Sequence, residues 1–269
     1  MDAFGAFERE GWSEGRAAPY HHGLGAITAR PAEALLDLAR VGEGTSVLDV
    51  ATGPGYVAGR AAARGASVVA VDFSDEMLTL AATLHPQVDF QQADAEALPF
   101  GDGSFDAVVA AFLMPHVSDL PAVCAELARV VRPGGRLALT TWDPEPESFT
   151  RFLFESITES GAVAPPSLPP GPPFFQYAGS DEFTSLLAEA GLSEVSVVAL
   201  SFTHPITDLD AFWADLVGGT VRASALFRAQ TLELQGRIRR MYGERLERWR
   251  VAGGWDVACA VKLGAATRT

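Results

Sequence analysis

The pattern of apolar and polar positions changes near residue 142. Before that point, short apolar runs have the length and β-branched content of strands; they cover residues 45–51, 67–72, 88–92, 104–112 and 136–142. The segments before and between them have helical periodicity; they cover residues 31–40, 55–64, 74–84 and 118–131. Because strands that are apolar almost throughout alternate with helices, the pattern predicts a parallel sheet with helices on both faces.

Residues that begin and end helices support these boundaries. Pro31 lies in the first turn of one predicted helix. Ser74 is placed to cap another, and Asp75 and Glu76 complement the dipole at its N-terminus. The run at 132–135, Arg-Pro-Gly-Gly, predicts the turn between the helix at 118–131 and the strand at 136–142.

Beyond Trp142 proline becomes frequent. Residues 143–178 therefore predict a mostly extended segment, which is either a linker or part of a lid that buries Phe174, Phe175 and Tyr177. The pattern after it predicts further elements, namely a helix at 180–190, a strand at 194–202, a helical region at 207–250 that begins with a capping box of Thr207 and Asp210, and a closing strand at 255–263.

The composition narrows the class of protein. The chain has 269 residues, 48% of them hydrophobic, and a net charge of −14. Such an acidic surface repels polyphosphate, so we expect no nucleic-acid substrate, whereas a small cationic ligand is compatible with it. The first residues do not resemble a signal peptide and no apolar run is long enough for a membrane span, so we expect a cytoplasmic protein. Cys124 and Cys259 lie in apolar runs, which predicts core positions and no metal site.

The strongest candidate for chemistry is VLDVATGPGYVAGR at residues 47–60, where a predicted strand runs into Gly53-Pro54-Gly55 and then a helix. Glycines let the backbone approach a ligand closely, and the helix N-terminus presents free amides. Gly53, Gly55 and Ala58 also fit the dinucleotide pattern, and Asp72 lies where a dehydrogenase keeps its ribose-binding acid. These features alone do not show whether the site binds a dinucleotide such as NAD or a different cofactor.

Other residues favour a cationic cofactor. Asp49 lies inside the strand end, where a buried carboxylate would repel a pyrophosphate but would attract a ligand with an ammonium and a sulfonium group. Asp94 follows the third strand, with apolar Ala97 and Leu98 after it, which is a plausible adenine site. The helix, Pro-Gly-Gly turn and strand at 127–142 complete the set.

These motifs together resemble the class I methyltransferases that depend on S-adenosylmethionine (SAM). The segments VLDVATGPG, VVAVDFSDEML, DAEALPF, SFDAVV and RVVRPGGRLAL occur in the order and spacing of that family. The resemblance covers residues 41–142 and is nearest to ubiquinone/menaquinone-biosynthesis C-methyltransferases and natural-product methyltransferases. It implies a Rossmann-like, doubly wound α/β fold with a mostly parallel seven-stranded sheet and a final antiparallel strand. It also implies an N-terminal helical cap over the cofactor site at 1–40, and a region at 143–269 that holds the rest of the sheet and an inserted helical lid (143–178 and 207–250).

The resemblance also implies roles for individual residues. The methionine part of SAM would be lined by Asp49, Ala51, Gly53 and Gly55. Asp72 would accept hydrogen bonds from both ribose hydroxyls. The adenine would be bordered by Phe73, Met77, Asp94 and Ala95, with Asp94 taking the amino group. Ala111 and Phe112 would approach the amino-acid end, and S-adenosylhomocysteine would be the product.

Residues that would catalyse the methyl transfer are harder to identify, because the sulfonium already activates the methyl group and the orientation of the acceptor supplies most of the catalysis. His116, in FLMPHV, is either a base near the methyl group or a histidine without chemistry. Tyr20, His21 and His22 belong to a segment that folds over the SAM site in similar enzymes, and one of them is a candidate base or gate. Arg30 is a candidate partner for the SAM carboxylate, and we expect no metal in the site.

The acceptor is predicted mainly by exclusion. AAFLMPHV lacks the Asn/Asp-Pro-Pro-Tyr signature of base methylation, and the lid region is rich in phenylalanine, which suggests a small aromatic or polyketide-like acceptor methylated on O, N or C. A cyclase that binds SAM without transferring methyl, and less so an NAD(P)-dependent oxidoreductase, remain alternatives. We expect no membrane partner and either a monomer or a homodimer.

Overall fold

The computed structural model describes residues 2–13 and 15–269. The chain forms two compact units. The first unit comprises Met1–Ile27, Asp143–Gly171 and Ser201–Ala260. The second comprises Thr28–Trp142, Pro172–Leu200 and Val261–Thr269, and it holds most of the residues predicted to bind the cofactor.

One sheet holds all the strands that the structure describes. Its strands are β1 (Ser46–Val50), β2 (Ser67–Asp72), β3 (Asp89–Gln92), β4 (Phe105–Ala111), β5 (Val131–Trp142), β6 (Leu192–Ile206) and β8 (Gly254–Arg268). β1 to β5 belong to the second unit, whereas β6 and β8 each run from one unit into the other. The strand order is β3-β2-β1-β4-β5-β8-β6, and the two-residue strand β7 (Arg250–Val251) pairs with β8 off this path. Strands β1 to β5 pair in parallel and β8 runs antiparallel to β5, which confirms the predicted doubly wound sheet with an antiparallel final strand.

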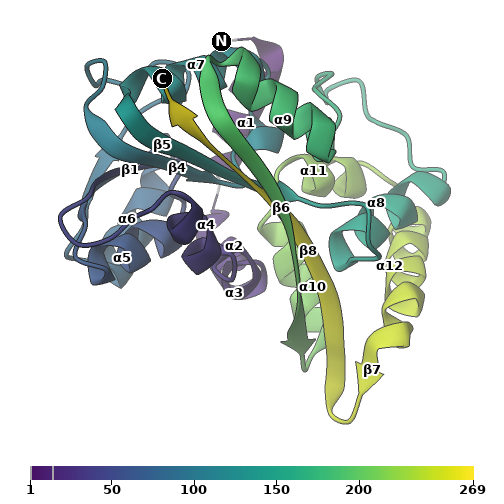
Figure 1. The fold of residues 1–269 in the computed structure, drawn as a ribbon. Helices are drawn as coiled ribbons and strands as arrows, with labels where there is room; N and C mark the ends of the chain where they lie inside the picture. Colours follow the sequence, from purple (N-terminus) through teal and green to yellow (C-terminus); the bar gives the residue numbers. More distant parts are fainter. Residues whose placement is uncertain (1, 14) are drawn as a thin grey trace. The chain divides into compact units, whose positions relative to one another are not determined.

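Helices cover both faces of this sheet (Figure 1). The helices of the second unit are α4 (Ala32–Leu38), α5 (Tyr56–Ala63), α6 (Asp75–Leu84), α7 (Leu120–Val130) and α9 (Ser180–Glu189), with the short 3₁₀ helix η1 (Met114–His116) after β4. α4 and α5 pack together on one face, and α7 packs with α9 on the other. A hydrophobic core lies under α7 and α9, where Leu48, Val108 and Leu127 are completely buried. Ser74 caps α6 as predicted, accepting a hydrogen bond from the Met77 amide.

The first unit is mainly helical. Its helices are α1 (Ala3–Trp12), α2 (Ala17–Gly23), α8 (Phe149–Glu159), α10 (Leu209–Gly218), α11 (Arg222–Arg228) and α12 (Leu232–Leu246), followed by the 3₁₀ turn η2 (Glu247–Trp249). The short helix α3 (Gly25–Thr28) falls at the boundary of the units. α10 packs against α2, and α12 packs against α8.

The prediction that residues 143–178 are mostly extended is wrong for their middle part. Prolines flank residues 147–164 on both sides but are absent within them, so a helix can form there. Ser148 caps α8 by accepting from the Arg151 amide, and Phe149, Phe152 and Leu153 are buried at helical spacing. The local density of proline therefore concealed a short amphipathic helix.

Two smaller boundaries also differ from the prediction. Thr207 does not cap α10; Asp208 does, by accepting from the amides of Asp210 and Ala211. The strand predicted at 136–142 begins earlier, at Val131, so the Pro-Gly-Gly run is an irregularity within β5 and not a turn before it. Gly135 is needed there because a Cβ atom would lie 2.6 Å from the carbonyl oxygen of Asp106.

Candidate cofactor site

The predicted cofactor residues gather at the carboxyl edge of the parallel strands. Asp49 of β1 lies beside Ala70 of β2 and Val109 of β4, so these strands end at the same edge. Asp72 ends β2, and Ala111 ends β4. Between β1 and β4 the strand order reverses direction, and open α/β sheets bind their ligands at such a switch point.

The glycines after β1 are required for two different reasons. Gly53 has a φ of +52°, and a Cβ atom on it would meet nothing within 4 Å, so the space above it is open to a ligand. Gly55 has a φ of +79° and begins α5, but a Cβ atom there would lie 2.9 Å from the ring of Phe90. The prediction that glycine admits a ligand therefore fits Gly53, whereas Gly55 is needed mainly for packing inside the protein.

Two residues without glycine's freedom also have positive φ at this edge. Ala51 has a φ of +54° directly after β1, and Phe112 has a φ of +61° directly after β4. This conformation costs an L-residue roughly 1–2 kcal/mol, and such strain is concentrated at ligand sites. The Phe112 amide donates to the carbonyl of Thr140, and its ring packs on Trp142 with the centroids 4.5 Å apart, which holds the strained residue in place.

Asp49 is the central polar group of the site. Its Oδ2 accepts from the Thr52 hydroxyl at 2.7 Å and from the Ala58 amide at 3.0 Å. Its Oδ1 is buried and has no hydrogen-bond partner among the described residues. Burial raises the pKa of Asp49 to about 7, although the two donors act in the opposite direction. A carboxylate in this state is stabilised by a cation that reaches Oδ1.

Thr52 is a contributor that sequence reasoning missed. It is not among the residues predicted to line the cofactor, but its hydroxyl donates to Asp49. The signal available in the sequence is its position, because a hydroxyl three residues after the strand-end Asp49 is close enough along the chain to reach that carboxylate.

Asp72 is held by backbone amides. Its Oδ2 accepts from the Gly53 amide at 2.8 Å and its Oδ1 from the Ser74 amide at 2.9 Å. Burial raises the pKa of Asp72, while these amides and the nearby His116 lower it. Each carboxylate oxygen has a further lone pair, so the fixed carboxylate can accept from two neighbouring hydroxyls.

The proposed adenine side is built by α6 and the turn after β3. Met77 is buried and Phe73 is half-buried at the start of α6. Asp94 is half-buried, and its Oδ1 accepts from the Glu96 amide at 3.0 Å, so the turn fixes this carboxylate as well. Ala95 beside it is buried.

The catalytic candidates fall in different units. His116 ends η1 in the second unit and lies close enough to Asp72 to influence its pKa. Tyr20, His21 and His22 lie on α2 in the first unit, where the Tyr20 ring meets that of Trp12 edge-on. Their role over the cofactor stays a prediction.

Arg30 is also unsupported as a ligand to the cofactor carboxylate. It lies in the turn before α4, its side chain is exposed, and it has neither an ion pair nor a side-chain hydrogen bond to the described part of the chain. Its role stays a prediction.

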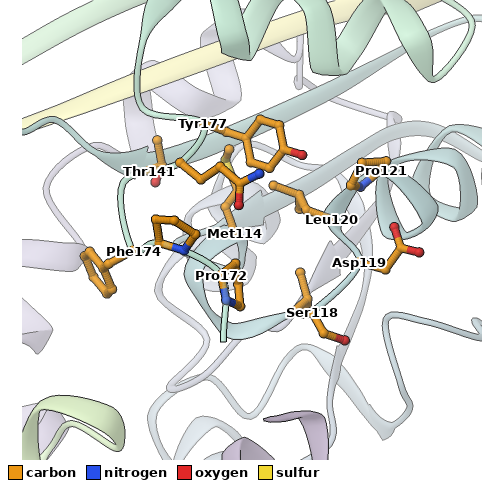
Figure 2. A pocket seen from close by; sticks show the side chains of 12 residues that line it. Met114, Ser118, Asp119, Leu120, Pro121, Thr141, Pro172, Phe174 and Tyr177 are labelled. Carbon is orange, nitrogen blue, oxygen red and sulfur yellow. The ribbon is translucent and has the colours of Figure 1, made fainter. Parts of the chain in front are cut away.

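A pocket lies beside η1 and the start of α7 in the second unit (Figure 2). Its wall combines apolar and aromatic side chains with polar ones, includes the carboxylate of Asp119 and contains no Lys, Arg or His; the lining residues are Met114, Val117, Ser118, Asp119, Leu120, Pro121, Thr141, Pro172, Pro173, Phe174, Gln176 and Tyr177. Met114 and Val117 flank His116 in the chain, and Thr141 follows the residue that pairs with Ala111. The pocket therefore begins within a few residues of the carboxyl edge of β4 and β5.

The described part of the chain contains neither a metal-binding cluster nor a helix that could span a membrane. Across residues 2–13 and 15–269 no cluster of His, Cys, Asp and Glu is arranged to hold a metal ion. None of the helices in this part of the chain has the length and hydropathy needed to cross a bilayer. Cys124 and Cys259 are buried, and burial raises the pKa of each thiol to about 12.

Residues 48–139 match the model of the methyltransferase domain family. A demethylmenaquinone methyltransferase of Streptomyces avermitilis is 31% identical over 217 residues, which cover 76% of this chain and 80% of the relative. A second such enzyme, from Renibacterium salmoninarum, is 40% identical over 119 residues, which cover 42% of this chain and 50% of the relative. The chain thus matches only about half the length of that relative.

Solved structures share the fold. A putative methyltransferase from an antibiotic biosynthesis pathway of Anabaena variabilis has a TM-score of 0.59 at 23% identity, over 88% of this chain and 96% of that one. The [4+2]-cyclase SpnF has a TM-score of 0.54 at 18% identity, over 90% of this chain and 82% of that one. At these identities the likeness concerns the fold alone.

Proposed function

The chain belongs to the SAM-dependent methyltransferase family, and from this premise we propose that it transfers a methyl group from SAM to O, N or C of a small, largely apolar acceptor. The observation that carries the proposal is the buried Oδ1 of Asp49, which no described residue satisfies. An unpaired buried carboxylate oxygen is costly, and an ammonium group is its natural partner.

The residues at the sheet edge fit the rest of the cofactor. Asp72 is fixed where it can accept from the two ribose hydroxyls, and Asp94 is fixed where it can accept from an amino group. Open space above Gly53 leaves room for the methionine part. When bound, SAM supplies a methyl group activated by the sulfonium.

The protein contributes to the reaction by orienting the acceptor and by removing its proton. His116 is the candidate to take that proton, since it lies at the end of η1 near both Asp72 and the pocket. We expect His116→Ala to slow turnover while SAM affinity is retained; normal turnover would remove His116 from the mechanism.

The pocket beside η1 supports an acceptor without a negative charge, because Asp119 is the charged residue in its lining. Phe174, Tyr177 and prolines offer flat apolar walls, and Ser118 and Gln176 offer hydrogen bonds. Because no basic side chain lines it, a carboxylate or phosphate acceptor would find no counter-charge there. A small aromatic or polyketide-like molecule with a hydroxyl or amino group fits this lining best.

Two measurements test the proposal. Calorimetric titration is expected to show binding of SAM and S-adenosylhomocysteine and none of NAD(H); the reverse result would contradict the cofactor assignment. Incubation with methyl-labelled SAM and a panel of neutral aromatic acceptors is expected to give labelled product. An unlabelled isomer as the only product would instead support a cyclase, the activity named for the structural neighbour SpnF.

A further inference from the structure

His85 lies at the end of α6, and its ring rests against α5. A Cβ atom on Gly59 would lie 2.3 Å from Nδ1 of this ring, and one on Gly55 would lie 3.1 Å from its Cδ2. The ring therefore occupies the space that side chains at these two positions would fill. Gly59 is inside a helix, where glycine is less favourable than alanine, and the contact with His85 explains why glycine stands there.

The surroundings of the ring disfavour its charged form. Ala81 of α6 and Phe90 of β3 border the same space beside Gly55 that the ring borders, and the charge that acts on the ring from α5 is Arg60. Burial and the Arg60 charge lower the pKa of His85. Its Nε2 is buried without a hydrogen-bond partner in the described part of the chain. The half-buried ring thus acts on α5 by shape rather than by a hydrogen bond.

This contact connects the two halves of the cofactor site. α6 begins directly after Asp72 and Ser74, on the ribose side, and α5 donates the Ala58 amide to Asp49, on the side assigned to methionine. We propose that His85 is a positioning residue, whose ring holds the first turn of α5 and thereby fixes Asp49 for the methionine part of the cofactor. This proposal rests on the proposed function.

The test compares a ligand that has the amino-acid part with one that lacks it. S-adenosylhomocysteine and 5′-methylthioadenosine, which lacks the amino-acid part, are titrated into the wild type, His85→Ala and the control Thr83→Ala, an exposed residue on the same turn of α6. We expect His85→Ala to lower the affinity for S-adenosylhomocysteine about tenfold and to leave the affinity for methylthioadenosine within about twofold of the wild type. Thr83→Ala is expected to change neither affinity. Equal losses for both ligands, or no loss, would overturn the proposal.

A second variant excludes a general loss of structure. Gly59→Ala alone is expected to weaken S-adenosylhomocysteine, because the new methyl group displaces the His85 ring. In a His85→Ala background the same change is expected to do no further harm, because the ring is gone. Additive losses would show that His85 and Gly59 act separately and would contradict the proposal. If the wild type binds neither ligand, it is the proposed function that fails.

Discussion

At the scale of single residues, Asp49 combines full burial with one carboxylate oxygen that no described residue satisfies. Asp72 is buried as well, but backbone amides satisfy both of its oxygens. The two carboxylates therefore differ in what they need from a ligand. Asp49 needs a positive charge, whereas Asp72 offers acceptors to neutral hydroxyls.

The first prediction concerns the pH dependence of Asp49. Its pKa in the folded protein is raised from 3.8 to about 7, so its favourable contribution to folding is present below pH 3.8 and is lost as the pH rises through about 7. A cation binds the ionised form, so SAM affinity should rise with pH and level off above about 7, with proton release on binding below that pH. Calorimetry in buffers of different ionisation enthalpy measures this release.

Asp49→Asn provides the comparison. Without the Asp49 carboxylate, its SAM affinity should be weaker and should change less with pH over the same range, the remaining change coming from groups such as Asp72. Asp181→Asn, at an exposed position of α9, removes the same charge from the surface and should behave as the wild type. A wild-type affinity that does not change with pH would contradict the assignment.

The second prediction concerns Asp72. Asp72→Ala should lower the affinity for SAM by more than about 30-fold, or about 2 kcal/mol of binding free energy, because the ribose hydroxyls lose a charged partner. The affinity for 5′-methylthioadenosine, which keeps the ribose, should fall by as much, and titration of both ligands measures these affinities. Unchanged affinity would mean that the ribose lies elsewhere.

At the scale of elements, capping decides where helices form in a proline-rich segment. Ser148 is completely buried and supplies the cap of α8, and the buried face of the helix begins at Phe149. Helix α12 likewise begins at a side-chain cap, Thr231, whose hydroxyl accepts from the Leu234 amide. Local hydrogen bonds of this kind set the boundaries that periodicity alone misplaced.

The third prediction tests the cap of α8. Ser148→Ala should lower the free energy of unfolding by about 1 kcal/mol, because the Arg151 amide loses its acceptor. Urea unfolding followed by circular dichroism measures the loss. Thr158→Ala, on the exposed face of the same helix, should cost distinctly less, and equal costs would show that the cap contributes nothing special.

At the scale of the whole molecule, the net charge of −14 dominates the electrostatics. Ion pairs such as Arg129 with Asp102 and Arg64 with Asp37 are on the surface, where each contributes little. We therefore expect repulsion among the excess acidic groups to outweigh these ion pairs, and salt screens that repulsion.

The fourth prediction follows from this balance. Raising the ionic strength from about 10 mM to about 150 mM should raise the melting temperature, because the Debye length shortens from about 30 Å to about 8 Å. Scanning calorimetry of the apoprotein measures the shift. A melting temperature that falls with salt would show that the surface ion pairs outweigh the net charge.

The sequence by itself determined the sheet and the edge at which the candidate site lies. Strand and helix periods are local properties, so β1 to β4 and α5 to α7 were predicted nearly to their ends, and the order of Asp49, Gly53, Asp72 and Asp94 placed them at or just beyond the carboxyl ends of successive strands. Composition and motif order also indicated a cationic cofactor, because charge and spacing can be read without coordinates.

Only the tertiary structure decided how those residues behave. The unsatisfied Oδ1 of Asp49 depends on which amides and hydroxyls reach it across the loop, and the positive φ of Ala51 and Phe112 depends on the elements that hold them. The contact of His85 with Gly59 joins residues on different helices. Such properties arise from packing between segments distant in the chain, which no local pattern records.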